Sequence, residues 1–112
     1  MTSQGTASGR FTRACAADNV HAAEMAMREM GQPSLLIALD YLALLARARP
    51  EKLELAALRW HARFESETIV SLAESQLALA ALTSLCAGHA EAIGILEHLL
   101  RRARPTLVRR HA

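Results

Sequence analysis

Between Ser34 and Arg104, leucine, alanine or isoleucine recurs at almost every third or fourth position, and glycine and proline, apart from Gly94, fall only where one helix should end and the next begin. A helix with a wide apolar stripe must bury that stripe against another element. Aromatic residues, which favour strands, are scarce in the 112-residue chain. They are Phe11, Tyr41, Trp60 and Phe64. The sequence therefore predicts one all-α domain with a single core.

Start and stop signals divide the chain into about five antiparallel helices. One helix is expected over residues 20–30, after a cap at Asp18 or Asn19. The next, over 35–49, begins after Ser34 and is apolar on nearly all sides. Helices of that kind are usually buried on several sides, so we expect this one at the centre of the fold.

The remaining helices follow Pro50 and a capping box. Pro50 suits the first position of the third helix, and Ser71 with Glu74 forms the S-x-x-E pattern that satisfies two amide donors at the start of the fourth. A fifth helix over 89–104 ends at Pro105. We expect these helices to pack as hairpins, in a bundle or a short α-solenoid. A weak internal echo at an offset of 37 residues leaves true repetition open.

The two ends of the chain differ from its middle. Residues 1–9 are rich in Ser, Thr and Gly and are expected to form a disordered tail, followed by a short helical turn over 11–17. We assign 10–104 to the helical domain and 105–112 to a basic tail. Residues 1–100 hold eight basic and eleven acidic residues, whereas the last twelve hold five arginines and no acid. The protein is thus a mildly acidic body with a basic end.

The segment from Arg59 to Phe64 interleaves arginine with aromatic residues. Such a pattern can stack on bases or bind phosphate. At helical spacing, however, Trp60 and Phe64 share one face, and Arg59 and Arg63 share the adjacent face. We favour this structural interpretation, because the single tryptophan of an aromatic-poor chain suits the core. The expected core residues are Leu42, Trp60, Phe64 and Leu96.

Five arginines lie near the end of the chain: Arg101, Arg102, Arg104, Arg109 and Arg110. They could neutralise phosphates on a nucleic acid, giving weak, salt-sensitive binding without sequence preference. Alternatively, they form a solvated terminus whose first three arginines complement a helix dipole. We favour the solvated terminus, because nucleic-acid binders usually present a basic face and this body is acidic.

The sequence contains no recognisable catalytic, metal or nucleotide-binding motif. Cys15 and Cys86 lie in apolar stretches, where a cysteine usually behaves as a small buried hydrophobe. Cys86 and His89 could supply two zinc ligands, but no second pair is evident. Asp40 is the one acid that could lie near apolar surroundings and have a raised pKa, although an exposed position or an arginine partner is favoured. We expect no enzyme activity, cofactor or metal.

The expected location is the cytoplasm. The first ten residues, MTSQGTASGR, lack the apolar core of a signal peptide. The longest uncharged stretch, 75–90, is too short and too polar to span a membrane. We therefore expect no membrane partner.

Three local patterns resemble short helical proteins encoded in GC-rich actinobacterial genomes. They are D-N-x-x-x-A over 18–23, P-S-L-x-x-A-L over 33–39 and R-W-x-x-R-F over 59–64. No activity is assigned to that group, so the resemblance implies no functional residues here.

The leading hypothesis is a non-enzymatic protein-interaction module that self-associates. About two and a half helical hairpins leave terminal faces without an obvious polar cap, and such faces tend to bind partners. The alternative is a nucleic-acid-binding accessory protein that acts through the arginine-rich C-terminus.

Overall fold

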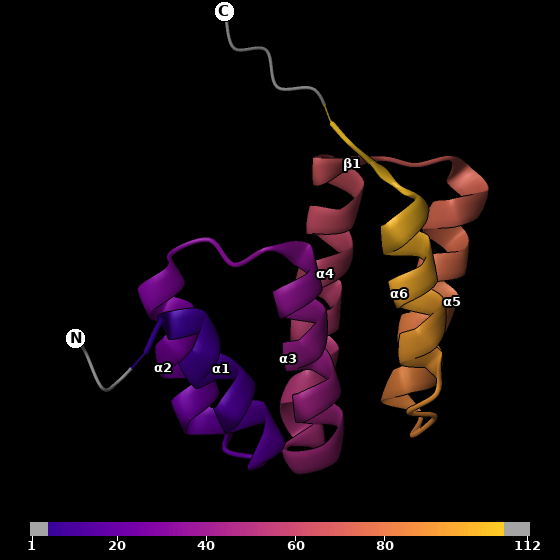
Figure 1. The fold of residues 1–112 in the computed structure, drawn as a ribbon. Coiled ribbons are helices and arrows are strands. Elements are labelled where there is room, and N and C mark those ends of the chain that lie inside the picture. Colours follow the sequence, from indigo (N-terminus) through magenta and orange to yellow (C-terminus); the bar gives the residue numbers. More distant parts are fainter. Residues whose placement is uncertain (1–4, 107–112) are drawn as a thin grey trace, which may run out of the picture.

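Six α-helices make up the fold that a computed structural model describes for residues 5–106 (Figure 1). They are α1 (Ala7–Ala16), α2 (Val20–Met30), α3 (Leu35–Ala48), α4 (Leu53–Glu67), α5 (Leu72–Cys86) and α6 (Ala92–Arg102). A 3₁₀ turn, η1 (Pro50–Lys52), leads into α4. Two short strands, β1 (Thr68–Ile69) and β2 (Arg104–Pro105), form an antiparallel pair. The all-α fold class is confirmed, with six helices described where about five were expected.

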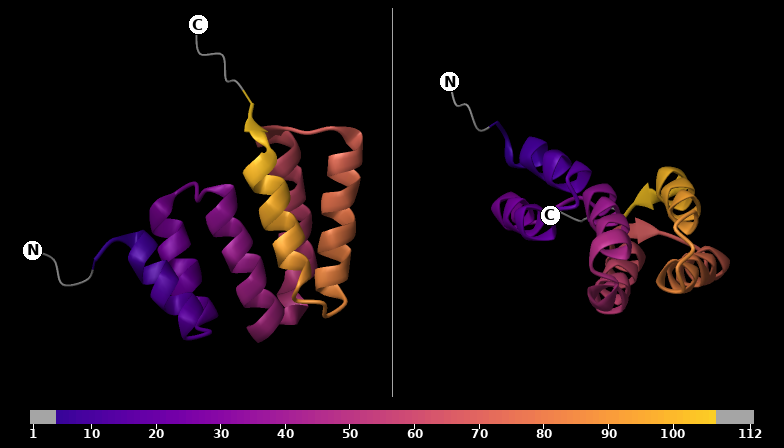
Figure 2. Two further views of the ribbon diagram at one scale, coloured as in Figure 1. Left: turned by 45° about the vertical axis from the view of Figure 1, so that its right-hand side comes forward. Right: turned by 90° about the horizontal axis from the view of Figure 1, so that it is seen from below.

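Helices α3 to α6 form a closed ring. Each packs on the next along the chain, and α6 returns to pack on α3 (Figure 2). Of the two predicted arrangements, this ring is a bundle rather than an open solenoid. The α1–α2 hairpin lies beside the ring, against α3. Helix α3 thus contacts α1, α2, α4 and α6, which confirms its central position.

The core lies where the ring helices face one another. Four leucines of α3 are at most 1% exposed: Leu39, Leu42, Leu44 and Leu45. The other residues expected in the core, Trp60, Phe64 and Leu96, are at most 2% exposed. Burial of this apolar surface is the main force that holds the ring together.

Helix α1 corrects the expected N-terminal boundary. It begins at Ala7, inside the segment expected to be a disordered tail, and is a full helix rather than a short turn. The side chain of Thr6 caps it by accepting a hydrogen bond from the Gly9 amide at 2.9 Å. Phe11, which is 3% exposed, anchors the helix in the core. Residues 1–4 lie outside the described residues.

Three of the predicted helix starts are found with their capping side chains, whereas the helix expected to begin at residue 89 begins at Ala92, without a side-chain cap. Asn19, not Asp18, caps α2, because its Oδ1 accepts from the Ala22 amide at 3.0 Å. Asp18 adopts φ 53° in the turn before it. Ser34 caps α3. The capping box of Ser71 and Glu74 at the start of α5 is confirmed.

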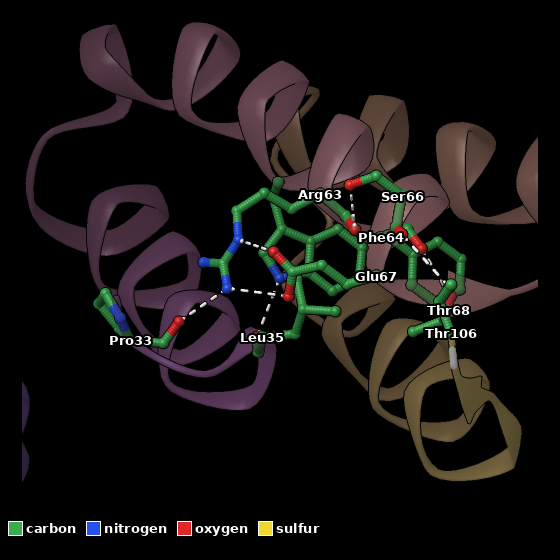
Figure 3. Close-up of polar contacts among 9 residues, drawn as sticks. Pro33, Leu35, Arg63, Phe64, Ser66, Glu67, Thr68 and Thr106 are labelled. Atoms are coloured by element: carbon green, nitrogen blue, oxygen red, sulfur yellow. Dashed lines mark hydrogen bonds and ion pairs between the residues drawn. The ribbon is translucent and has the colours of Figure 1, made fainter. Parts of the chain in front are cut away.

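The last helix was expected to run to Arg104, but α6 ends two residues earlier, at Arg102. Proline disfavours helical backbone at the residue before it, so the chain is extended where the fifth helix was expected to continue. Thr106 donates from its amide to the Glu67 carbonyl at 2.9 Å and from its hydroxyl to the Ser66 carbonyl at 3.2 Å (Figure 3). Residues 104–106 are therefore part of the folded domain and not of a separate tail. The paired strand residues are Thr68 with Pro105 and Ile69 with Arg104.

Candidate functional site

The segment from Arg59 to Phe64 is occupied mainly by structural contacts. The indole Nε1 of Trp60 donates to the Leu35 carbonyl at 3.0 Å, and its ring stacks on that of Phe64 with centroids 5.2 Å apart. Arg63 donates to Glu67 and to the Pro33 carbonyl, both at 2.7 Å (Figure 3). These contacts tie α4 to the start of α3 and leave little of the two aromatic rings for a base to stack on.

Arg59 differs from its neighbours. Its side chain is exposed, and within residues 5–106 it makes no hydrogen bond or ion pair. It lies at the rim of a groove between α2, α3 and α4, with a volume of about 450 Å³. The apolar residues that line this groove, called here the α2–α4 groove, are Met27, Ala38, Leu42, Leu55, Ala56 and Trp60.

The other polar residues of the α2–α4 groove already have partners. Tyr41 donates from its hydroxyl to Glu24 at 2.6 Å, and Lys52 binds the same carboxylate oxygen at 2.7 Å. These two hydrogen bonds, that from Lys52 first, hold the pKa of Glu24 below its usual value. Burial, followed by the hydrogen bond to Glu24, raises the pKa of Tyr41. Glu51 accepts from Arg49 at 2.5 Å.

A second candidate surface is the outer side of α5. This helix buries one stripe against α4 and α6. Its opposite side, called here the α5 outer face, is exposed and consists of Leu72, Ala73, Gln76, Leu77, Leu79, Ala80, Thr83 and Cys86. Leu72 is 76% exposed, Leu77 47% and Leu79 43%. The chain carries no Asp, Glu, Lys or Arg between Glu74 and Glu91. Helix α5 therefore resembles α3 in composition, but within residues 5–106 it packs mainly against α4 and α6, whereas α3 also contacts α1 and α2.

A shallow hollow of about 200 Å³ adjoins the α5 outer face, between α4 and α5. Leu58, which is 55% exposed, lies on its α4 side. Leu79 and Cys86 line it from α5. Apolar side chains thus continue from α5 onto α4, where the carboxylate of Glu54 also lines the hollow.

A partly buried polar cluster joins α4 to α5. The Nε2 atom of His61 lies 3.2 Å from the Ser75 hydroxyl and 3.1 Å from its carbonyl oxygen. The Ser75 hydroxyl also donates to Glu65, whose Oε1 is 4.0 Å from Nδ1 of His61. Sequence reasoning found no partner for any serine, because these three residues meet only when α5 folds back on α4. The residue types are those of a nucleophile, a base and an acid.

The geometry of this cluster is that of a structural link. Ser75 is 8% exposed and lines neither the α2–α4 groove nor the hollow beside α5. Its hydroxyl hydrogen is directed to the Glu65 carboxylate rather than to the imidazole. A buried hydroxyl needs such a partner, and here the partners fasten two neighbouring helices.

The arginine-rich end is only partly described. Arg101 and Arg102 are exposed in the last turn of α6, and Arg104 is exposed in β2. None of the three makes a hydrogen bond from its side chain or an ion pair within the described part of the chain. Arg109 and Arg110 lie outside the described residues.

The remaining sequence candidates do not come together as a reactive site. Cys15 is half-buried, whereas Cys86, expected to be buried, is exposed because it lies on the outer side of α5. Partial desolvation raises the pKa of both thiols, and the charge of Glu54 adds to the rise at Cys86. Partial desolvation, with the charge of Glu97, raises the pKa of the exposed Asp40 carboxyl. Within residues 5–106 no three His, Cys, Asp or Glu side chains are placed to hold a metal ion, and no helix is long and apolar enough to cross a membrane.

Comparisons with protein-family models, curated proteins and solved structures each gave no match to this chain. The resemblance to helical actinobacterial proteins stays a prediction.

Proposed function

We propose that the protein is a non-enzymatic protein-interaction module that self-associates through the α5 outer face. The observation that carries the proposal is the exposure of Leu72 and Leu79, which lie seven residues apart on one uncharged side of the helix, Leu72 above all. Large contiguous apolar patches on a protein surface mark interaction sites. A cytoplasmic location is part of the proposal, since the free thiols of Cys15 and Cys86 suit a reducing compartment.

A second copy of the chain fits this face. Leu72, Leu79 and Cys86 recur at intervals of seven residues, as do Ala73 and Ala80, so each set stays on one side of the helix. The alanines leave room for close approach of a partner helix. Two-fold symmetry is the commonest arrangement of soluble oligomers, and pairing two uncharged faces brings no like charges together. An α5–α5 contact between copies would cover the exposed leucines of both.

The mass of the protein in solution tests the proposal. Size-exclusion chromatography with light scattering, over a dilution series, should show a dimer that dissociates in the Leu72→Glu/Leu79→Glu variant. The matched control is Leu36→Glu, which adds a charge at a leucine of α3 that is 53% exposed. A monomeric mass for the unmodified chain at every concentration would refute self-association. So would equal effects of the α3 and α5 variants.

The alternative function, weak binding of nucleic acid, is favoured by one observation. Arg101, Arg102 and Arg104 are exposed and make no ion pair in the described part of the chain, although the charge of Arg102 contributes to lowering the pKa of Glu74. A gel-shift assay at low salt compares the full chain with the variant in which these three arginines are glutamine. A chain that ends at Thr106 separates their contribution from that of Arg109 and Arg110. We expect salt-sensitive binding without sequence preference, and no binding at low salt would exclude this function.

A further inference from the structure

We propose that the α2–α4 groove binds a free small amphiphile with one anionic head group, of the medium-chain carboxylate class. The apolar body would lie along the groove floor, and the carboxylate would bind Arg59. This site is separate from the α5 outer face and does not depend on self-association.

The groove offers an apolar bed for such a body. Leu42 from α3 and Trp60 from α4, both at most 2% exposed, form its inner part. Met27 of α2 and Leu55 of α4 line it further out, and Leu55 is 57% exposed. A volume of about 450 Å³ lies within the range of small-molecule sites, which are mostly apolar with a few polar groups.

Small side chains keep this space open. Ala38 on α3 and Ala56 on α4 both line the groove, so neither helix fills it with a longer side chain. Helix α2 packs on α3 and lines the groove with Met27, opposite the residues that α4 contributes. The space is a consequence of how the α1–α2 hairpin sits beside the ring (Figure 2).

The charge of the ligand follows from which polar groups are already satisfied. Tyr41 and Lys52 share the Glu24 carboxylate, Arg63 binds Glu67, and Glu51 binds Arg49. A ligand would have to break these interactions to use them. These polar residues therefore do not need a charged group of the ligand as a partner.

Arg59 is the exception among the groove residues. Its guanidinium makes no hydrogen bond or ion pair with residues 5–106, although it lines the groove. Tyr41 lines the same groove, and the positive charge of Arg59 partly offsets the rise in the pKa of its phenol. One unpaired cation beside an apolar floor complements one carboxylate on an apolar body, because a guanidinium binds a carboxylate in a bidentate, charge-assisted geometry.

Trp60 provides the measurement, since it is the single tryptophan of the chain and lines the groove. Titration with decanoate, below the concentration at which decanoate forms micelles, should change the intrinsic fluorescence of Trp60 in a saturable way. Titration with 1-decanol, which has the same chain without the charge, and with decylamine, which has the opposite charge, should give much weaker binding. Calorimetry of the same titrations gives an independent affinity.

Two variants locate the site. Arg59→Gln should weaken decanoate about tenfold and leave 1-decanol unchanged, since it removes one charge-assisted contact. Ala56→Leu should weaken both ligands by filling the groove. Arg101→Gln, at an exposed arginine of α6, and Leu72→Gln, on the α5 outer face, are the controls and should bind decanoate like the unmodified chain.

Three results would overturn the proposal. The first is the absence of saturable decanoate binding by both fluorescence and calorimetry. The second is equal affinity for decanoate and 1-decanol, which would mean that the head group is not recognised. The third is a loss of decanoate binding in Leu72→Gln but not in Arg59→Gln, which would place the ligand on the α5 outer face instead. None of these results bears on the mass measurement that tests self-association.

Discussion

Replacing Phe64 by alanine should be one of the most destabilising single changes in the ring. Its side chain is fully buried and its ring stacks on that of Trp60 at 5.2 Å. Truncation of a buried phenylalanine costs about 3–5 kcal/mol, part of it from the cavity that remains. The aromatic pair itself contributes about 0.5–1.5 kcal/mol beyond buried area. We therefore expect a loss of about 4 kcal/mol for Phe64→Ala and about 1–1.5 kcal/mol for Phe64→Leu, which keeps most of the volume.

Urea unfolding followed by circular dichroism measures this loss. With a slope of about 2 kcal/mol per molar urea, the Phe64→Ala midpoint should fall by about 2 M. All samples need the same protein concentration, because self-association would raise the apparent stability. Leu36→Ala, at an exposed leucine of α3, is the control and should change stability by less than about 0.5 kcal/mol. If Phe64→Ala behaved like the control, the stacked pair would not be part of the core, and the structural interpretation of this segment would be wrong.

Three further changes test other parts of the fold. In the folded protein the hydrogen bond from Lys52 lowers the pKa of Glu24. The ionised Glu24 therefore stabilises the fold at a pH above its unfolded-state pKa of about 4.3, and this stabilisation is lost as the pH falls through its folded-state pKa. Glu24→Gln should therefore lower the melting temperature at pH 7, by an amount corresponding to about 1 kcal/mol, and have little effect at pH 3. At Asp40 the sign is opposite: desolvation raises the folded pKa, so Asp40→Asn should stabilise at pH 7, by less than about 1 kcal/mol, and not at pH 3. A melting temperature that moves the other way in either pH series would contradict these assignments. A chain that ends at Ala103 should be less stable than one that ends at Thr106 by about 1–3 kcal/mol, since it lacks the two hydrogen bonds from Thr106 to the last turn of α4. Equal thermal unfolding of the two chains would show that these bonds do not contribute.

Much of the fold could be predicted because its determinants are local. The Ser34 cap and the Ser71–Glu74 capping box act within one turn of helix, and the sequence shows them directly. The α1 helix was expected to be only a short turn, because its Ser- and Gly-rich start resembles a tail. Its stability depends on Phe11, which reaches a core that local patterns do not reveal. The pairing of β1 with β2 was missed for the same reason, since it joins residues nearly forty positions apart.

The candidate surfaces were harder to predict than the helices. Apolar composition correctly predicted that α3 lies at the centre. Helix α5 has a similar composition, yet in the described part of the chain it packs mainly against two helices, α4 and α6. Composition shows how much apolar surface a helix has, but the topology decides how many neighbours cover it. The α2–α4 groove depends likewise on the gap between α2 and α4, which the sequence does not show. Spacing alone also does not distinguish Arg63, which binds Glu67 and the Pro33 carbonyl, from Arg59, which makes no hydrogen bond or ion pair within residues 5–106.

The position of the α1–α2 hairpin has a consequence for the dynamics of the molecule. Besides its apolar contacts with α3, the hairpin is fastened by polar links at or near the surface: Asp18 with Arg47, and Glu24 with Lys52. Salt screens such pairs, whereas the buried interfaces of the ring are little affected. At high ionic strength, amide hydrogen exchange should therefore accelerate in α1 and α2 before it does in α3 to α6. The hairpin would then open as a unit of its own, and since it carries Met27, its opening would widen the α2–α4 groove while the ring stays closed.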